Sequence, residues 1–368
     1  MSDPIVYFTD LRSRVGYNLL DKTRKLFEKS GFADHIDEGD KVAVKLHFGE
    51  AGNTAFLPPM YARVIVDEVK KAGGKPFVTD TNTLYKGSRG NAIDHLETAM
   101  ANGFSYATLG APLVIGDGLI GLDYITEKVN GKRFEEVKIA SAVYHADVII
   151  TLAHFTAHEL FGFGGVIKSI GMGGAAPSGK QELHSDVLPV VDSEKCTSCG
   201  RCVRWCPADS INLKEGEPAQ IIETVCIGCG ECTVVCTDGA IDVNWKTDIP
   251  ALLEKTSEYA YGVLKNKAGK HLSFNFLFNI SPDCDCFDFN DPPFVSDVGI
   301  MVSTDPVAID QAAIDMANRA QGLAGSKLED LEAKDKFRSV TGIDWEPLLA
   351  HGEEIGLGRR EYRLEEIE

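Results

Sequence analysis

Eight of the ten cysteines in this chain lie between positions 196 and 236, in two runs of identical spacing. Both runs have the form C-x2-C-x2-C-x3-C, and their cysteines are Cys196, Cys199, Cys202 and Cys206, then Cys226, Cys229, Cys232 and Cys236. Three thiolates at this spacing can bind one iron–sulfur cubane, and the fourth ligand then comes from the other run. The pattern predicts two 4Fe-4S clusters. One would be held by Cys196, Cys199, Cys202 and Cys236, and the other by Cys226, Cys229, Cys232 and Cys206.

Pairs of zinc sites are the alternative, because zinc also binds to C-x2-C motifs. Two runs of four cysteines are better explained by clusters than by the spacings that zinc usually shows. Pro207 follows the first run, as in bacterial two-cluster ferredoxins, and Thr237 takes this place after the second run. Acidic residues surround both runs, and negative charge disfavours the addition of an electron. We therefore expect low-potential clusters and a redox partner protein.

The other two cysteines, Cys284 and Cys286, follow a predicted strand. If the backbone stays extended, residues two apart point to one side, so both thiolates can bind one metal ion or one iron of a cluster. Two buried, inert cysteines are the alternative, but the neighbouring prolines and aspartates make this a poor core segment. A disulfide between the two would be strained. We favour a third site for a metal, a cluster or an organic cofactor.

Polar side chains also follow the most apolar predicted strand, Asp147–Phe155. Parallel α/β sheets place their sites at the carboxyl ends of strands. The candidate catalytic residues here are His154, His158, Lys168 and His184. A glycine-rich loop precedes Lys168 and can cradle a phosphate against the next helix, although it matches neither common nucleotide-binding pattern. Its candidate cofactor-binding residues are Gly162, Gly164 and Gly165. A structural role is the usual alternative for any single histidine.

A second loop carries two basic residues. Lys86 and Arg89 follow the predicted strand Pro76–Thr81 in a segment rich in glycine and serine, so they can bind an anionic cofactor or small-molecule substrate. A solvated loop is the alternative of equal weight. His47 and Asp80 end two predicted strands and have the same placement as the histidines after Asp147–Phe155.

The elements that must position these residues alternate between strands and helices, which favours an α/β fold with a mostly parallel sheet. The expected strands are Pro4–Thr9, Lys41–Phe48, Pro76–Thr81, Asp147–Phe155, Leu272–Ile280 and Val298–Ser303. The expected helices are Tyr17–Phe32, Pro58–Lys71, Asn91–Asn102 and Asp305–Arg319. Asn130-Gly131 predicts a hairpin turn. Residues 1–190 and 247–325 would form the host domain, 191–246 an inserted two-cluster ferredoxin-like domain, and 326–368 a charged tail.

Composition narrows the function classes. The formal net charge of −18 argues against nucleic-acid binding, which needs a basic face. No apolar run is long enough to span a bilayer, and the first residues do not have the pattern of a signal peptide. We expect a cytoplasmic protein of anaerobic metabolism that binds neither membranes nor nucleic acid.

The chain resembles the family called domain of unknown function 362, in its ferredoxin-bearing form. The residues that carry this resemblance are VKLHFGE, VTDTNTLYKGSRGNA, GFGGVIKSIGMG, the cysteine runs and STDPVAID, which ends at Asp310. The resemblance implies two clusters and an α/β host domain. The series His158-x9-Lys168-x15-His184 is also similar to the nickel-pincer lactate racemases. That similarity implies a cofactor-anchoring role for Lys168 and a metal-binding role for His184.

These observations favour an iron–sulfur oxidoreductase that passes electrons from two clusters to a site in the α/β domain. The alternatives are a non-catalytic electron carrier with a partner-docking domain, and a metal- or cofactor-dependent racemase- or ligase-like enzyme with accessory clusters. A pure carrier has no need for histidine, lysine and cysteine gathered at one sheet edge.

Overall fold

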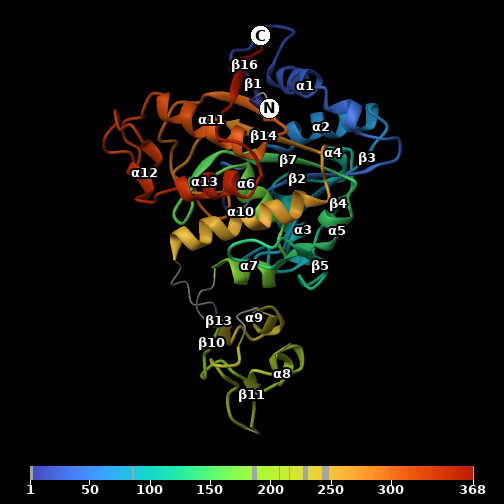
Figure 1. Cartoon of the computed structure of the whole chain (residues 1–368), viewed down its shortest axis with the longest axis vertical. Coiled ribbons are helices and arrows are strands. Elements are labelled where there is room, and N and C mark those ends of the chain that lie inside the picture. The colour runs from blue at the N-terminus through green and yellow to red at the C-terminus, as the bar shows by residue number, and fades with distance from the viewer. Residues whose placement is uncertain are drawn as a thin grey trace.

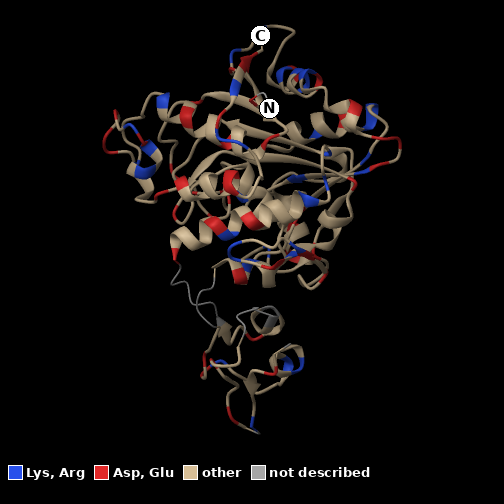
Figure 2. Ribbon diagram, viewed as in Figure 1, with Lys and Arg blue, Asp and Glu red and all other residues tan. Residues whose placement is uncertain are grey.

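The computed structural model describes residues 3–84, 87–184, 189–206, 208–214, 216–226, 231–242 and 248–367. Two predicted site residues, Lys86 and Cys229, lie outside these ranges. Among the described residues, no helix combines the length and the apolar character needed to cross a bilayer. Acidic and basic residues are interspersed along the ribbon (Figure 2).

An eight-stranded sheet forms the centre of the α/β part (Figure 1). In spatial order its strands are β16 (Arg363–Glu366), β1 (Ile5–Thr9), β15 (Gly299–Ser303), β14 (His271–Leu277), β7 (Val148–His154), β2 (Lys41–Leu46), β3 (Lys75–Asp80) and β4 (Leu113–Ile115). The strands β14, β7, β2, β3 and β4 are parallel to their neighbours along this series. The predicted α/β fold with a mostly parallel sheet is confirmed.

Strand β15 departs from the parallel arrangement, because it is antiparallel to both β14 and β1. A parallel connection needs a crossover, usually through a helix, whereas antiparallel neighbours do not. The segment between β14 and β15 contains no helix and returns the chain along the same sheet. It is this helix-free segment that carries Cys284 and Cys286.

Helices cover both faces of the sheet, so its strands are buried on two sides. In β7 all seven residues are buried. Ile149 and Ala153 pack into a core that includes helices α6, α10 and α11, whereas Ile150 and Leu152 pack on the other face with α1 and α2. The helices of this part are α1 (Leu19–Ser30), the 3-10 helix Phe32–His35, α2 (Pro59–Lys71), α3 (Ala92–Ala101), α4 (Tyr106–Leu109), α5 (Ser141–His145), α6 (Val166–Gly174), α7 (Pro177–His184), α10 (Ile249–Lys265), α11 (Pro306–Arg319), α12 (Lys336–Thr341) and α13 (Glu346–Glu354).

Two small antiparallel pairs complete the α/β part. The hairpin of β5 (Tyr124–Lys128) and β6 (Glu136–Ala140) turns where the sequence predicts it, and Asn130 there has a φ of 49°. The second pair, β8 (Thr156–His158) and β9 (Gly162–Gly164), extends the chain beyond β7. It carries His158 and two of the candidate glycines.

For residues 326–368 the sequence predicts a charged tail that is helical in parts. These residues supply α12, α13 and β16, and β16 pairs with β1 in parallel at the edge of the main sheet. The sequence does not predict β16, because edge strands are short and tolerate charged residues, and the sequence of this strand, RLEE, gives no apolar alternation.

The cysteine-rich segment (residues 191–246) lies at one end of the molecule, beside α7 (Figure 1). Its described elements are α8 (Arg201–Trp205), β11 (Ile211–Asn212), β12 (Gln220–Ile221), α9 (Glu231–Val235) and β13 (Ile241–Asp242), which pairs with β10 (Val190–Val191). None of these described strands joins the eight-stranded sheet. The predicted domain boundaries themselves stay a prediction.

Candidate functional site

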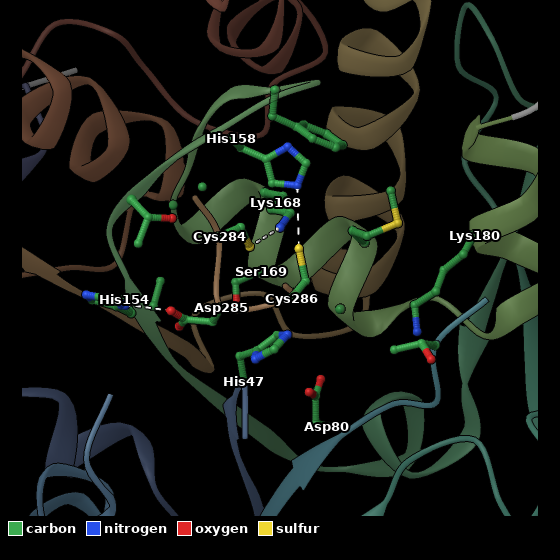
Figure 3. A pocket seen from close by; sticks show the side chains of 18 of the residues that line it. His47, Asp80, His154, His158, Lys168, Ser169, Lys180, Cys284, Asp285 and Cys286 are labelled. Carbon is green, nitrogen blue, oxygen red and sulfur yellow. Dashed lines mark hydrogen bonds and ion pairs between the residues drawn. The ribbon is translucent and has the colours of Figure 1, made fainter. Parts of the chain in front are cut away.

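A cavity of about 490 Å³ lies at the carboxyl edge of β2, β3, β7 and β14. This volume is within the range of small-molecule sites. Figure 3 shows residues from each of these strand ends, and from α6 and α7, around one space. Of the predicted candidates, the cavity wall contains His154, His158, Gly164, Gly165, Lys168, His184, Arg89, Cys284 and Cys286.

Four of these residues form a compact cluster. The Nζ atom of Lys168 donates a hydrogen bond to Sγ of Cys284 at 3.0 Å, and Sγ of Cys286 lies 3.9 Å from Nε2 of His158 (Figure 3). One ligand atom each from His158, Cys284 and Cys286 lies within 4.8 Å of the others, so this group can hold a metal ion. We call these three residues and Lys168 the thiol cluster.

The two thiols of the thiol cluster differ in acidity. The hydrogen bond from Cys286 and the nearby ammonium of Lys168 outweigh burial and hold the pKa of Cys284 well below its usual value. The same hydrogen bond, with burial, raises the pKa of Cys286 well above its usual value. The charge of Cys284 in turn outweighs burial and raises the pKa of Lys168. These shifts favour a thiolate on Cys284, a thiol on Cys286 and an ammonium ion on Lys168.

The two histidines of β7 and β8 have different roles. Nδ1 of His158 accepts a hydrogen bond from the backbone N–H of Leu160 at 3.1 Å. Burial and the charge of Lys168 lower the pKa of His158, so the neutral ring carries its proton on Nε2 and presents it towards Cys286. Binding of a metal through this nitrogen requires the other tautomer, in which Nδ1 gives up the bond to Leu160.

The sequence predicts a catalytic role for His154, but both of its ring nitrogens contact other protein atoms. Nδ1 lies 2.9 Å from Oδ1 of Asp285, and Nε2 lies 2.9 Å from the carbonyl oxygen of Phe278. Although burial acts against it, the Asp285 carboxylate raises the pKa of His154. Both ring nitrogens thus have hydrogen-bond partners, and His154 fixes the position of Asp285, which lies between Cys284 and Cys286. We describe it as a positioning residue, not a ligand.

The first two amides of α6, after the glycine-rich loop, are not free to bind a phosphate. The carboxylate of Asp310 accepts hydrogen bonds from the backbone N–H groups of Val166 and Ile167, both at 2.8 Å. Gly165 permits this approach, since a Cβ atom there would lie 2.4 Å from Oδ1 of Asp310. The expected phosphate cradle is therefore wrong at the first amides of α6, because a buried side chain already satisfies them.

The carboxylate of Asp310 should make a large contribution to stability. Replacing Asp310 with alanine leaves the amides of Val166 and Ile167 and the side chain of Asn275 without their acceptor. We expect the free energy of unfolding to fall by at least about 3 kcal/mol, because each buried unsatisfied donor costs roughly 1–3 kcal/mol. Anaerobic urea denaturation would measure this, with the exposed change Asp344→Ala as control.

Measuring the free energy of unfolding at several pH values separates the effect of the charge of Asp310 from the effect of its size and shape. Burial raises the pKa of Asp310 from 3.8 to about 6. The folded protein therefore favours the protonated carboxyl group. The contribution of this preference to the free energy of unfolding is fully present below pH 3.8 and is lost as the pH rises towards 6. Asp310→Asn, which cannot ionise, should lack that loss. Parallel pH profiles of the two proteins would contradict this assignment.

Arg89 is buried, so the solvated loop is wrong for this residue. Its Nε donates to Oε2 of Glu50 at 3.1 Å, and one terminal nitrogen lies 3.5 Å from Oδ2 of Asp80. Asp80 is also 3.6 Å from Nζ of Lys45. The carboxylate of Asp80 thus serves two cations, and these charges keep its pKa below the usual value despite burial.

Sequence reasoning missed two buried lysines of the cavity wall. Lys45 points inward from β2 and donates to Oγ of Ser169 at 2.9 Å. Lys180 lies on α7 and donates to Oγ1 of Thr81 at 2.6 Å. The signal for Lys45 is a lysine within the apolar strand KVAVKL, where a charge needs a buried partner. Lys180 gives no comparable signal in its helix.

The first predicted set of cluster ligands surrounds one small cavity. Cys196, Cys199, Cys202 and Cys236 line it, together with Gly200 and Ala219. Backbone N–H groups point at two of the sulfurs, from Ala219 to Cys196 at 3.4 Å and from Ala240 to Cys236 at 3.2 Å. Four thiols with amide donors around one space fit a 4Fe-4S cluster.

The same backbone pattern occurs twice in the cysteine-rich segment. Sγ of Cys236 accepts from Ala240, whose carbonyl accepts from Asp192, whose carbonyl accepts from the N–H of Cys196. Sγ of Cys206 accepts from Ser210, whose carbonyl accepts from Ile222, whose carbonyl accepts from the N–H of Cys226. Each chain of bonds connects the last cysteine of one run to the first of the other. The second set is described only for Cys206, Cys226 and Cys232.

The fold and the site define an α/β protein with a thiol-lined cavity beside a segment of eight cysteines. The chain matches the family described as domain of unknown function (DUF362) over residues 42–315, and it belongs to that family. It is also 31% identical over 85 residues to the pyruvate synthase subunit PorD of Thermotoga maritima, across 23% of this chain and 83% of that subunit.

Two solved structures are similar at low identity. One is the lactate racemase apoprotein from Thermoanaerobacterium thermosaccharolyticum, with 12% identity, a TM-score of 0.34, and coverage of 74% of this chain and 50% of that chain. The other is a structural-genomics protein from Thermotoga maritima, with 11% identity, a TM-score of 0.34, and coverage of 70% and 50%. This chain spans half the length of each of these proteins.

Proposed function

We propose that this protein is an iron–sulfur oxidoreductase in which electrons pass from two 4Fe-4S clusters in the cysteine-rich segment to the thiol cluster of the α/β cavity. The clusters would supply one-electron transfer. Cys196, Cys199, Cys202 and Cys236 would hold one of them, and Cys226, Cys229, Cys232 and Cys206 the other.

The position of α7 carries this proposal. This helix lines the cavity through Lys180 and His184, and it packs against α9, which carries Cys232. Eight helical residues extend over only about 12 Å. A pathway from the cysteine-rich segment to the cavity would therefore be about as long as this one short helix.

At the cavity end, we propose that Cys284 and Cys286 bind the acceptor of these electrons, which is a metal ion, a cluster or an organic cofactor. Two thiolates leave a metal under-coordinated, and imidazole is a suitable further ligand for iron, nickel or zinc. His158 is in place for this role after a tautomer change. The Lys168 ammonium would balance the charge of the thiolate at 3.0 Å.

Anaerobic preparation should give at least about 8 iron and 8 acid-labile sulfide per chain, following the two-cubane pattern. Iron and sulfide assays with metal analysis would measure this. The same sample should contain further metal or an organic cofactor if the thiol cluster is loaded. Stoichiometric zinc without labile sulfide would refute the proposal.

The proposed partner is a redox protein that exchanges electrons with the cysteine-rich segment. The likeness to PorD, a pyruvate synthase subunit, supports a partner of this kind. In a carrier without catalysis the α/β part would only dock such partners. The buried thiol, ammonium and imidazole groups of the cavity favour the oxidoreductase over this alternative.

A racemase- or ligase-like enzyme with accessory clusters is the second candidate. The observation in its favour is that His158, Lys168 and His184, the three residues of the lactate racemase pattern, line one cavity. An organic cofactor anchored on Lys168 would raise the mass of the peptide that contains this residue. Nickel content and peptide mass spectrometry of the anaerobic protein distinguish this candidate from the first.

A further inference from the structure

The wall of the cavity formed by β2, β3 and α7 has an unusual charge arrangement. Lys45 and Lys180 are both buried, with exposed fractions of 2% and 7%. A buried ammonium is costly unless an anion or several hydrogen bonds compensate it. The partners of these two lysines therefore decide whether the wall is balanced by the protein alone.

Lys180 has no carboxylate partner at ion-pair distance among the described residues. Its Nζ donates to Oγ1 of Thr81 and to the backbone oxygen of Asn82, which are both neutral. The carboxylate of Asp117 acts on Lys180 from behind these groups, but it accepts hydrogen bonds from Asn82. Burial raises the pKa of Asp117 to about 6. An ammonium has three N–H donors, so one donor of Lys180 is not used by these two oxygens.

Lys45 is only partly compensated. Its hydrogen bond goes to the neutral hydroxyl of Ser169, and the carboxylate of Asp80 lies 3.6 Å away and is shared with Arg89. The glycine at position 173 makes room for the lysine head, since a Cβ there would lie 2.2 Å from Nζ of Lys45.

The two lysines belong to one wall. Oγ1 of Thr81, which accepts from Lys180, donates to the backbone oxygen of Gly173 at 3.0 Å, and Gly173 contacts the head of Lys45. His47 adds a neutral donor nearby. Its Nδ1 accepts from the N–H of Gly49 at 2.9 Å, which leaves the ring proton on Nε2. Figure 3 shows His47, Asp80 and Lys180 along the same side of the cavity.

We propose that Lys45 and Lys180, with the neutral donors of Ser169 and His47, bind the oxyanion group of the molecule on which the thiol cluster acts. This inference deepens the proposed function, because it names the substrate class as a small organic acid or phosphate ester. The oxyanion fills the unused donors of the lysines. The remainder of the molecule extends towards Lys168 and Cys284, along a wall that includes Met172 and Phe161.

The test uses the full-length protein prepared anaerobically, with acetate, inorganic phosphate and neutral acetamide as probes, at constant ionic strength. Calorimetric titration should detect binding of acetate or phosphate and much weaker binding of acetamide. The tighter of the two anions identifies the carboxylate or the phosphate class. Equal binding of acetate and acetamide by the unchanged protein would overturn the proposal without any variant.

Two lysine variants locate the binding. Lys180→Met should weaken anion binding at least about tenfold, which corresponds to the loss of one charge-assisted hydrogen bond. Lys267→Met is the matched control. Lys267 is equally buried, donates to the carbonyl oxygen of Tyr144 and to Asn266, and lies just before the amino end of β14. Anion binding that is unchanged in Lys180→Met, or lost equally in Lys267→Met, would refute the site.

Iron and sulfide content provides an independent readout. If the clusters are present but neither anion binds, the oxyanion site fails and the proposed electron transfer stands. If anions bind in a protein without iron or sulfide, the proposed function fails and the oxyanion site stands. Should Lys180→Met not fold, Lys45→Met and the acetate–acetamide comparison still decide the question.

Discussion

A protein in which both Cys284 and Cys286 are changed to serine should lose the metal or cofactor that the thiol cluster binds and keep both clusters of the cysteine-rich segment. The two thiols are the only cysteines that line this cavity in the described part of the chain, and Cys284 carries the thiolate that pairs with Lys168. Serine keeps the size of the side chain but not the soft anionic sulfur. We expect metal or cofactor affinity to fall by more than about 10²-fold, since even outer partners of a metal site contribute 10–100-fold.

Metal analysis would measure the loss from the cavity, and the spectra of the reduced clusters would show that both clusters remain. Asp283→Asn is a suitable control, because Asp283 lies in the same segment and pairs with Lys327, but does not line the cavity. A double variant with unchanged metal and cofactor content would contradict a third site. It would favour the simple electron carrier.

Loss of Cys236 should damage the cluster of the first run, and loss of Cys206 the cluster of the second. Each alanine variant should lose up to about 4 iron per chain, the content of one cubane. The repeated hydrogen-bond pattern gives the reason. It connects Cys236 to Cys196 and Cys206 to Cys226, so each last cysteine lies next to the other run.

The two clusters can be distinguished by combining each variant with a change in the first cysteine of a run. Cys236→Ala with Cys196→Ala should lose no more iron than either single change, whereas Cys206→Ala with Cys196→Ala should lose both clusters. Thr237→Ala, next to Cys236 but without a thiol, is the control. If Cys206→Ala and Cys196→Ala together remove only one cluster, the crossed assignment is wrong.

Much of the fold follows from apolar patterning. The strands β2, β3, β7 and β14 lie within a few residues of their predicted limits, because each is an apolar run between helices or turns. Their parallel order then brings the residues after each strand to one edge. For this reason the strand pattern of the sequence is enough to predict that Cys284, His158 and Lys168 share one region.

Other features depend on contacts between distant positions and leave no local signal. Asp310 occupies a helix whose sequence does not reveal that its carboxylate bonds the amides of Val166 and Ile167. The predicted phosphate cradle was wrong for this reason. The role of Lys180 likewise depends on how α7 lies beside Thr81 and Asn82, which follow β3. The engagement of both nitrogens of His154 depends on Asp285 and Phe278. Burial of such groups is a property of the assembled fold.

The neighbours of β1 have a consequence for biosynthesis. Within the described part of the chain this strand pairs only with β15 and β16. Both are translated roughly 300 residues after it, or about 15–60 s later at 5–20 residues per second. During this time the nascent chain has an apolar strand without either of its native partners. An unpaired strand of this kind is prone to aggregation, so the N-terminal region is exposed to this risk until β15 and β16 have been synthesised.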